Sequence, residues 1–343
     1  MSLTGQIRQP VESDYGELVR QIRVRGLLQP RPRYYVVLGS LNLVALLLAV
    51  AGLVLLRDSW WAVLLAPVFA VVSGQIAFFS HDAAHRQISR SSRVSAMLCL
   101  VHGNLLNGLS YGWWLDKHNA HHAHPNDLES DPDVAVGAFV FDAEQAGERR
   151  GMAAWLTRHQ AGLFFPMLTL EAINLRVSSV RAVLRPGLRY RRTEAALLLA
   201  HGVLYAALLV STLTWAQALV FLAVHQALFG VYLGCSFAPA HKGMPTLTPE
   251  QDSDPLLRQV LTARNVPGGP FLGLMLGGLN LQIEHHLFPS MPRPNLRRAR
   301  PIVRRHCQVH GIPYLETTLL ASYGLAFRHL HEVAGSAPPS ARS

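Results

Sequence analysis

Long apolar runs alternate with polar segments along this chain. Four of the runs are about 20 residues long, the length that a helix needs to cross a bilayer, and they cover residues 34–56, 60–80, 194–213 and 215–237. Only short turns separate the first run from the second and the third from the fourth, so each pair predicts a helical hairpin. The pattern therefore predicts an all-α integral membrane protein with about four transmembrane helices.

The segments outside these runs are polar or amphipathic. We expect residues 1–33 to form an N-terminal arm on the cytoplasmic side. Residues 34–343 are expected to form one membrane domain, whose segments 81–193 and 238–343 make a cytoplasmic helical cap that carries the candidate site. The arm has no short apolar core followed by a small-residue cleavage site, so we expect no cleavable signal peptide.

The distribution of charge predicts an orientation. The formal net charge is +10, and the arginines gather beside the apolar runs, whereas the two hairpin turns hold only Arg57. By the positive-inside rule, both termini and the central polar segment face the cytoplasm, and we expect the membrane to be the plasma membrane of a bacterium. Basic residues in these positions fit an anionic membrane face and exclude nucleic acid as the expected partner. The three cysteines have no paired spacing, so no disulfide framework is expected.

Three histidine clusters lie next to the apolar runs. Residues three or four apart on a helix share one face, and each cluster has this spacing: His81 with His85; His118 with His121 and His122; Gln282 with His285 and His286. Neutral imidazole is the commonest metal ligand in proteins and suits iron, zinc, copper and nickel. Three such clusters in one chain predict a metal site held by a membrane protein.

The three clusters resemble the histidine boxes of the membrane fatty-acid desaturase superfamily. The first has the form H-x(3–4)-H, the second H-x(2–3)-H-H, and the third [HQ]-x(2–3)-H-H, in the family's order. Residues 111–126, and residues 279–289 with Gln at the first position of the third box, are similar to the acyl-CoA/acyl-lipid branch that contains front-end and linoleoyl-CoA-like desaturases. A fused cytochrome-b5 module is not expected, because no His-Pro-Gly-Gly signature occurs.

The resemblance implies a non-haem site with two iron ions and an activity that inserts a cis double bond into a fatty acyl chain. The acyl chain would be linked to CoA, a carrier protein or a phospholipid. O2 would be the co-substrate, and the electrons would come from a separate donor such as ferredoxin or rubredoxin with its reductase. Cleavage of an unactivated C–H bond requires a redox cofactor, because no side chain supplies such an oxidant.

The resemblance also implies roles for individual residues. The box histidines would bind the metal, and His241 matches an isolated histidine that is a further ligand in the family. Ala240, before it, stands where the family often has Asn. The implied ligands are His81, His85, His118, His121, His122, His241, His285 and His286. Gln282 can be a ligand or lie behind the ligands. Metal-bound histidines usually donate their second ring N–H to another group, and the candidates for this are Asp82, Asp116, Asp131, Glu284 and Asn280. Aromatic residues that can line an acyl tunnel or anchor the chain at the interface are Tyr111, Trp113 and Trp114.

Two other interpretations remain open at this point. A membrane di-iron hydroxylase of alkyl, sphingolipid or carotenoid substrates would use the same boxes, although the context at residues 280–289 favours a desaturase. A metal transporter or metal-binding membrane sensor would place its ligands near the bilayer midplane, whereas these clusters lie beyond the ends of the predicted spans. Dependence on O2 and reductant would separate the enzyme from the transporter.

Overall fold

The protein is described by a computed structural model that places residues 12–135 and 137–337. Helices make up all the regular structure among these residues, apart from an isolated bridge between Asn265 and Glu316. The chain divides into two compact units. We call Pro30–Lys117 with Phe165–Cys235 the span unit, and Met1–Gln29 with His118–Phe164 and Ser236–Ser343 the cluster unit. The predicted N-terminal arm lies partly, at residues 1–11, outside the described residues.

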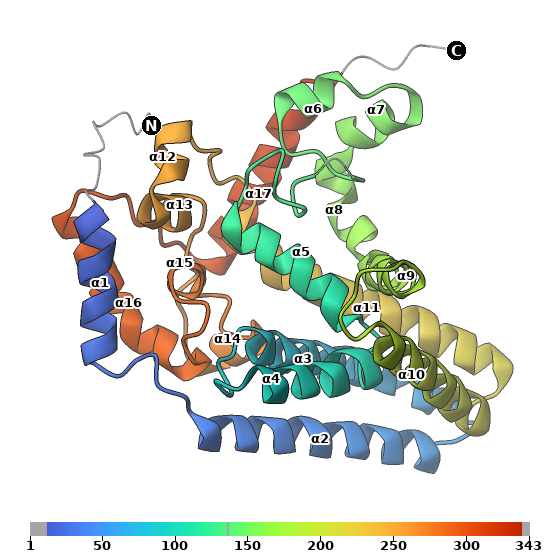
Figure 1. The fold of residues 1–343 in the computed structure, drawn as a ribbon. Coiled ribbons are helices and arrows are strands. Elements are labelled where there is room, and N and C mark those ends of the chain that lie inside the picture. The colour runs from blue at the N-terminus through green and yellow to red at the C-terminus, as the bar shows by residue number, and fades with distance from the viewer. Residues whose placement is uncertain (1–11, 136, 338–343) are drawn as a thin grey trace. The chain divides into compact units, whose positions relative to one another are not determined.

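The span unit contains the long apolar helices (Figure 1). Its elements are α2 (Pro32–Leu55), η1 (Trp60–Leu65), α3 (Ala66–Ala84), α4 (Ser92–Cys99), η2 (Leu100–Leu105), α9 (Glu171–Leu184), α10 (Arg191–Thr212) and most of α11 (Trp215–His241). Four helices are long and apolar enough to cross a membrane, η1 and α3 counting as one, which confirms the predicted number. The second and fourth extend further than expected, to Ala84 and His241. The bent pair α8 (Gln160–Leu168) and α9, at 66°, also passes this test if it is counted as one span.

The span helices pack through aromatic and small residues. Phe69 of α3 and Phe221 of α11 are buried and meet edge to face, with ring centroids 5.3 Å apart. Further along the same two helices, a Cβ atom at Gly74 would lie 2.2 Å from the ring of Tyr232. A glycine is therefore required at position 74, because it lets the two backbones approach as small residues do in membrane helix pairs.

The cluster unit is built from shorter helices. They are α1 (Glu12–Val24), the end of α5 (Tyr111–Ala123), α6 (Ala143–Gly147), α7 (Gly151–Arg158), α12 (Pro249–Ser253), α13 (Pro255–Leu261), α14 (Pro270–Met275), α15 (Gln282–Leu287), α16 (Arg293–Val309) and α17 (Leu319–Ala334). The basic helix α16 is amphipathic: Leu296 and Val303 are buried, whereas Arg297 and Arg304 are exposed.

The core of the cluster unit brings distant segments together. Leu18 and Ile22 of α1 are fully buried beside Ile283 of α15. Two polar contacts reinforce this packing, since Tyr15 Oη donates to the carbonyl of Leu287 (2.9 Å) and Asn295 donates to that of Leu27 (2.7 Å). The described part of the N-terminal arm thus belongs to the core that supports the third histidine cluster.

Candidate metal centre

Helix α5 carries the second histidine cluster in its last two turns. The spacing places His118 and His122 one turn apart on one face, and their Nε2 atoms lie 3.1 Å apart. His121 is buried, with 4% of its surface exposed. The helix ends at Ala123, whose carbonyl accepts a hydrogen bond from Arg258 Nη1 (2.9 Å). The second cluster therefore presents three imidazoles within an arc of about 100° on one side of the helix.

Helices α11 and α15 bring two further histidines to His121. The ring centroids of His121 and His241 are 4.7 Å apart, those of His121 and His286 are 5.1 Å apart, and those of His241 and His286 are 4.7 Å apart. One nitrogen atom from each ring lies within 4.8 Å of the other two. All three side chains are buried. This group is arranged as a metal-binding triad, and it joins segments that lie 120 and 45 positions apart in the sequence.

The hydrogen bonds of these three rings determine which nitrogen is available to a metal. His121 Nδ1 lies 2.8 Å from Asp131 Oδ2, and His241 Nδ1 lies 3.0 Å from the carbonyl oxygen of Thr262. His286 Nδ1 lies 2.9 Å from Gln259 Oε1. The Gln259 amide is held in this orientation because its Nε2 donates to the carbonyl of His122 (2.8 Å). Carboxylate and carbonyl oxygens accept only, so each Nδ1 carries the proton and each Nε2 keeps its lone pair. This is the arrangement that orients metal-ligating histidines.

The remaining histidines of the cluster unit continue this group. The ring of His122 lies 4.3 Å from that of His286 and 4.9 Å from that of His285, between centroids. His118 and His285 are 6.5 Å apart. Six of the eight predicted ligands are thus contiguous within one unit.

Asp131 is a fully satisfied carboxylate. Its Oδ2 also accepts the backbone N–H of Asn126 (2.8 Å), and its Oδ1 accepts that of Asp133 (2.8 Å). Burial alone would raise the pKa of the Asp131 carboxyl, but hydrogen bonds from His121 and from the backbone of Asp133 favour the ionised form, and this pKa lies below its usual value. Asp131 therefore stays ionised and stabilises a donating His121 Nδ1.

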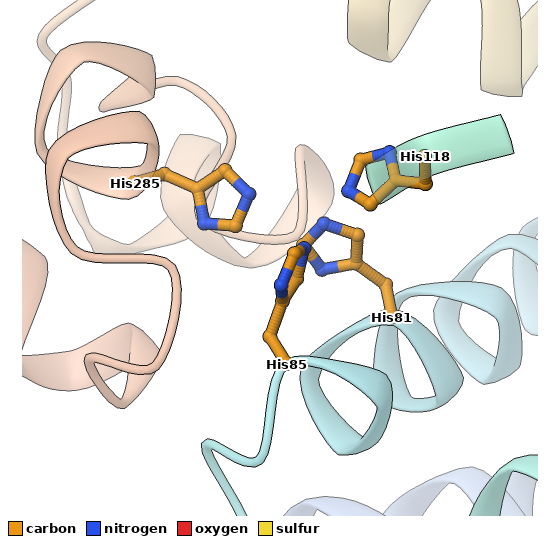
Figure 2. A group of neighbouring side chains, drawn as sticks. All are labelled: His81, His85, His118 and His285. Carbon is orange, nitrogen blue, oxygen red and sulfur yellow. The ribbon is translucent and has the colours of Figure 1, made fainter. Parts of the chain in front are cut away.

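The first cluster belongs to the span unit. Figure 2 shows His81 and His85 extending from the end of α3, whereas His118 comes from α5 and His285 from α15. The rings of His81 and His85 are 4.7 Å apart between centroids, and His81 Nδ1 lies 3.2 Å from Asp82 Oδ1. Burial and the neighbouring His81 lower the pKa of His85 well below its usual value. His85 is therefore held in the neutral form that a metal ligand requires.

Other predicted residues lie elsewhere. Asp116 is exposed on α5. Asn280 donates to the carbonyl of Val266 (3.2 Å). Glu284 is fully buried but accepts from Tyr314 Oη (2.6 Å) and Asn265 Nδ2 (2.8 Å), and burial raises its pKa to about 7 in spite of these bonds. The hydrogen-bond partners of Asn280 and Glu284 are therefore groups other than the histidine rings.

Gln282 and the aromatic candidates occupy intermediate positions. Gln282 Nε2 lies 2.9 Å from His241 Nε2, and its buried Oε1 has no hydrogen-bond partner. Tyr111, Trp113 and Trp114 are half-buried, and the ring of Trp114 lies 5.6 Å from that of His81. The Gln282 amide carries a donor nitrogen and an acceptor oxygen at nearly equivalent positions. Rotation of the amide by about 180° turns its oxygen towards a cation at His241.

Several residues of the site give no signal in the sequence. Gln259 and Thr262, on and just after α13, orient His286 and His241, and Asn126 donates to the same Thr262 carbonyl (3.0 Å) from a backbone with a positive φ of 63°. In the span unit, buried Glu194 accepts from Ser110 Oγ (2.6 Å) and from the backbone of Gly112 (3.2 Å) at the beginning of α5.

The donor set fits an iron site. A cluster of imidazole ligands suits iron, zinc and copper and excludes magnesium or calcium as the preferred ion. The buried Oε1 of Gln282, which has no hydrogen-bond partner within the described residues, is an additional oxygen donor at the same place.

Comparisons with known proteins agree with this geometry. The model of the fatty acid desaturase family matches residues 58–318. An acyl-lipid (9-3)-desaturase of Physcomitrium patens is 30% identical over 94% of this chain and 63% of its own length. A Delta(8)-fatty-acid desaturase 2 of Arabidopsis thaliana is 28% identical over 89% and 71%, and a Delta 8-(E)-sphingolipid desaturase of Emericella nidulans is 30% identical over 91% and 60%. This chain thus spans under two thirds of the Physcomitrium relative. With a family match over most of its length, the chain belongs to the fatty acid desaturase family.

Proposed function

We propose that this protein is an O2-dependent fatty acyl desaturase that inserts a cis double bond into a long acyl chain. The observation that carries this proposal is the buried triad of His121, His241 and His286, in which one nitrogen of each ring lies within 4.8 Å of the other two, in a chain of this family. The desaturase names of the relatives support the reaction.

The proposed ligands of two iron ions are the eight histidines that match the family's pattern. Six of them form the contiguous group of the cluster unit. The assignment of His81 and His85 rests on their match to the first box and on the lowered pKa of His85. Gln282 is proposed as an oxygen donor or as a partner of His241.

Each partner of the triad has a definite task in this proposal. Bound iron would activate O2 and supply the oxidant for an unactivated methylene group. Asp131, Thr262 and Gln259 accept hydrogen bonds from the three Nδ1 atoms, so that the rings keep their orientation and present Nε2 to the metal. Burial of the rings excludes water, which limits side reactions of a reactive oxidant.

The substrate and the orientation are further parts of the proposal. The four apolar helices give an acyl chain access from the bilayer, and Tyr111, Trp113 and Trp114 are proposed to line its path. We propose that residues 81–193 and 238–343 form a cap on the cytoplasmic side, with both termini there, because the arginines flank the spans on that side. A bacterial plasma membrane stays a prediction. The acyl carrier is CoA, a carrier protein or a phospholipid, and relatives named for acyl lipids favour the last.

The electrons are proposed to come from a separate donor, such as ferredoxin or rubredoxin with its reductase. The exposed arginines of α16 give the cluster unit a basic surface that suits an acidic donor. Mass spectrometry of purified complexes with either donor would test this choice.

Fatty-acid profiling tests the proposed reaction. The chain is expressed in a host with a compatible donor and reductase, and the lipids are analysed by gas chromatography–mass spectrometry after derivatisation of double bonds. We expect a new unsaturated fatty acid that is absent from a His121→Ala/His285→Ala control. A hydroxylated product would assign the chain to a hydroxylase. No new lipid from folded, iron-loaded protein with a working donor would reject the desaturase proposal.

A further inference from the structure

The end of α11, which carries His241, has backbone carbonyls that need partners. The last four carbonyls of a helix have no intrahelical donor, and Pro239 lies inside this last turn and has no N–H. Lys242 N donates to the carbonyl of Ala238 (3.1 Å), and Met244 N donates to that of His241 (3.0 Å). The carbonyls of residues 239, 240 and 242 therefore require donors from another segment.

Arg264 supplies a donor to each of these three carbonyls. Its backbone N–H donates to Ala240 O (3.0 Å), and its Nε donates to Pro239 O (2.7 Å). Its Nη2 donates to Lys242 O. The side chain is only 1% exposed and is among the largest fully buried ones. Arg264 thus contacts the backbone on both sides of His241, and Ser322 Oγ also donates to the carbonyl of Pro239.

The charge of Arg264 is placed for this task. Within the described residues, no carboxylate forms an ion pair with it; Nε also donates to Ser322 Oγ (2.9 Å), and Nη1 lies 3.6 Å from Met244 Sδ. Burial lowers the pKa of Arg264 to about 10, which leaves it charged at neutral pH. A cation is favoured at the negative end of a helix dipole, and that end of α11 is where the guanidinium lies.

The segment of Arg264 also holds the ring of His241. Thr262, two residues earlier, accepts the proton of His241 Nδ1 through its carbonyl (3.0 Å). Residues 262–264 therefore fix both the backbone turn and the ring orientation of this one histidine, and the two contacts act on the direction of a single lone pair.

We propose that Arg264 is the positioning residue of His241 and keeps its Nε2 directed towards His121 and His286. This inference rests on the proposed metal centre. It assigns a role to a residue outside all three histidine boxes, and it makes the affinity for metal, besides the stability of the fold, depend on a guanidinium that contacts no ligand ring.

Cobalt titration of the metal-free full chain in detergent measures this effect directly. Co²⁺ is the probe because its visible absorption reports on the ligands, with no turnover needed. We expect Arg264→Met to weaken Co²⁺ binding by about 10–100-fold, the range for loss of an outer partner of a metal ligand. Arg264→Lys is expected to lose less, because it keeps the charge without the fork of donors. The matched control is Arg300→Met, which removes an arginine paired with Glu316 in the same unit and should leave the affinity unchanged.

A double-mutant cycle separates positioning from general support of the fold. If Arg264 acts through His241, adding Arg264→Met to His241→Ala causes no further loss of Co²⁺ affinity. An equal loss in both backgrounds, or no loss from the single substitution, would overturn the inference. If Arg264→Met does not fold, Arg264→Lys is carried through the same cycle. If the wild-type protein binds Co²⁺ but forms no lipid product, the desaturase proposal is rejected, and the double-mutant cycle still tests the role of Arg264. If the wild-type protein binds no Co²⁺, both the desaturase proposal and the role of Arg264 are rejected.

Discussion

Histidines of the two units differ in what their ring nitrogens contact. In the cluster unit, His121 and His286 each donate Nδ1 to an oxygen that can only accept, and their Nε2 atoms point into the group of histidines. In the span unit, buried His225 uses both nitrogens, with Nδ1 2.6 Å from Tyr205 Oη and Nε2 3.2 Å from Ser73 Oγ. The first arrangement leaves a lone pair for a metal, and the second leaves none.

The difference shows that burial and an apolar neighbourhood do not make a histidine a ligand. Hydroxyl partners on both sides of a ring join membrane helices through hydrogen bonds. Nearby His201 donates its Nδ1 to the carbonyl of Leu105 (2.9 Å), but its ring stacks on Tyr205, with centroids 6.0 Å apart. What marks His121, His241 and His286 is an acceptor-only oxygen behind each ring together with another imidazole in front of it.

Removal of one histidine from each unit gives the largest expected contrast. His286→Ala deletes a ring that faces both His121 and His241, so we expect the loss of bound iron. The amount of unsaturated product should fall by more than about 100-fold, the upper effect of losing a hydrogen-bond partner of a metal ligand. His225→Ala should retain the iron. Iron per protein chain, by inductively coupled plasma mass spectrometry, checks both. Equal loss of iron in the two variants would contradict the comparison.

A smaller effect is expected when the partner of a ring is changed and the ring is kept. Asp131→Asn removes the charge behind His121 and a good acceptor for Asp133 N–H, which should weaken metal binding by about 10–100-fold. Tyr205→Phe removes the partner of His225 and should cost about 0.5–1.5 kcal/mol of stability with no change in metal affinity. Co²⁺ titration and thermal unfolding measure the two effects. A metal affinity unchanged in Asp131→Asn would show that the carboxylate does not orient the site.

The sequence predicts the spans and the histidine spacing because both are local signals. An apolar run of span length and an i, i+3, i+4 pattern need no knowledge of packing, and the four apolar helices follow from them. The orienting groups cannot be predicted in this way, because long-range packing places them. Gln259 lies 137 positions after His122, whose carbonyl it contacts, and nothing around residue 259 resembles a metal site.

Adjacency in the sequence is misleading for the same reason. Neighbouring residues on a helix point about 100° apart, since 3.6 residues make a turn. Glu284 precedes His285 yet faces Tyr314 and Asn265, and Asp116 of α5 faces solvent. Asp131, ten residues after His121 and beyond the helix, is the carboxylate that reaches the ring.

Substitution of Glu284 is expected to have the smallest effect on metal binding, because this buried carboxylate contacts no histidine ring nitrogen among the described residues. The pKa of the Glu284 carboxyl is about 7 in the folded protein, above the ordinary 4.5. The protonated carboxyl therefore stabilises the fold, by on the order of 3 kcal/mol, below a pH of about 4.5, and this stabilisation is lost as the pH rises to about 7. In metal-free protein, Glu284→Gln should therefore gain stability relative to the wild type across this window, as measured by thermal unfolding at several pH values. Its Co²⁺ affinity should match the wild type, because the carboxylate contacts Tyr314 and Asn265. A loss of affinity as large as that of Asp131→Asn would mean that any buried carboxylate near the histidines supports the site, and that contact with a ring nitrogen does not decide it.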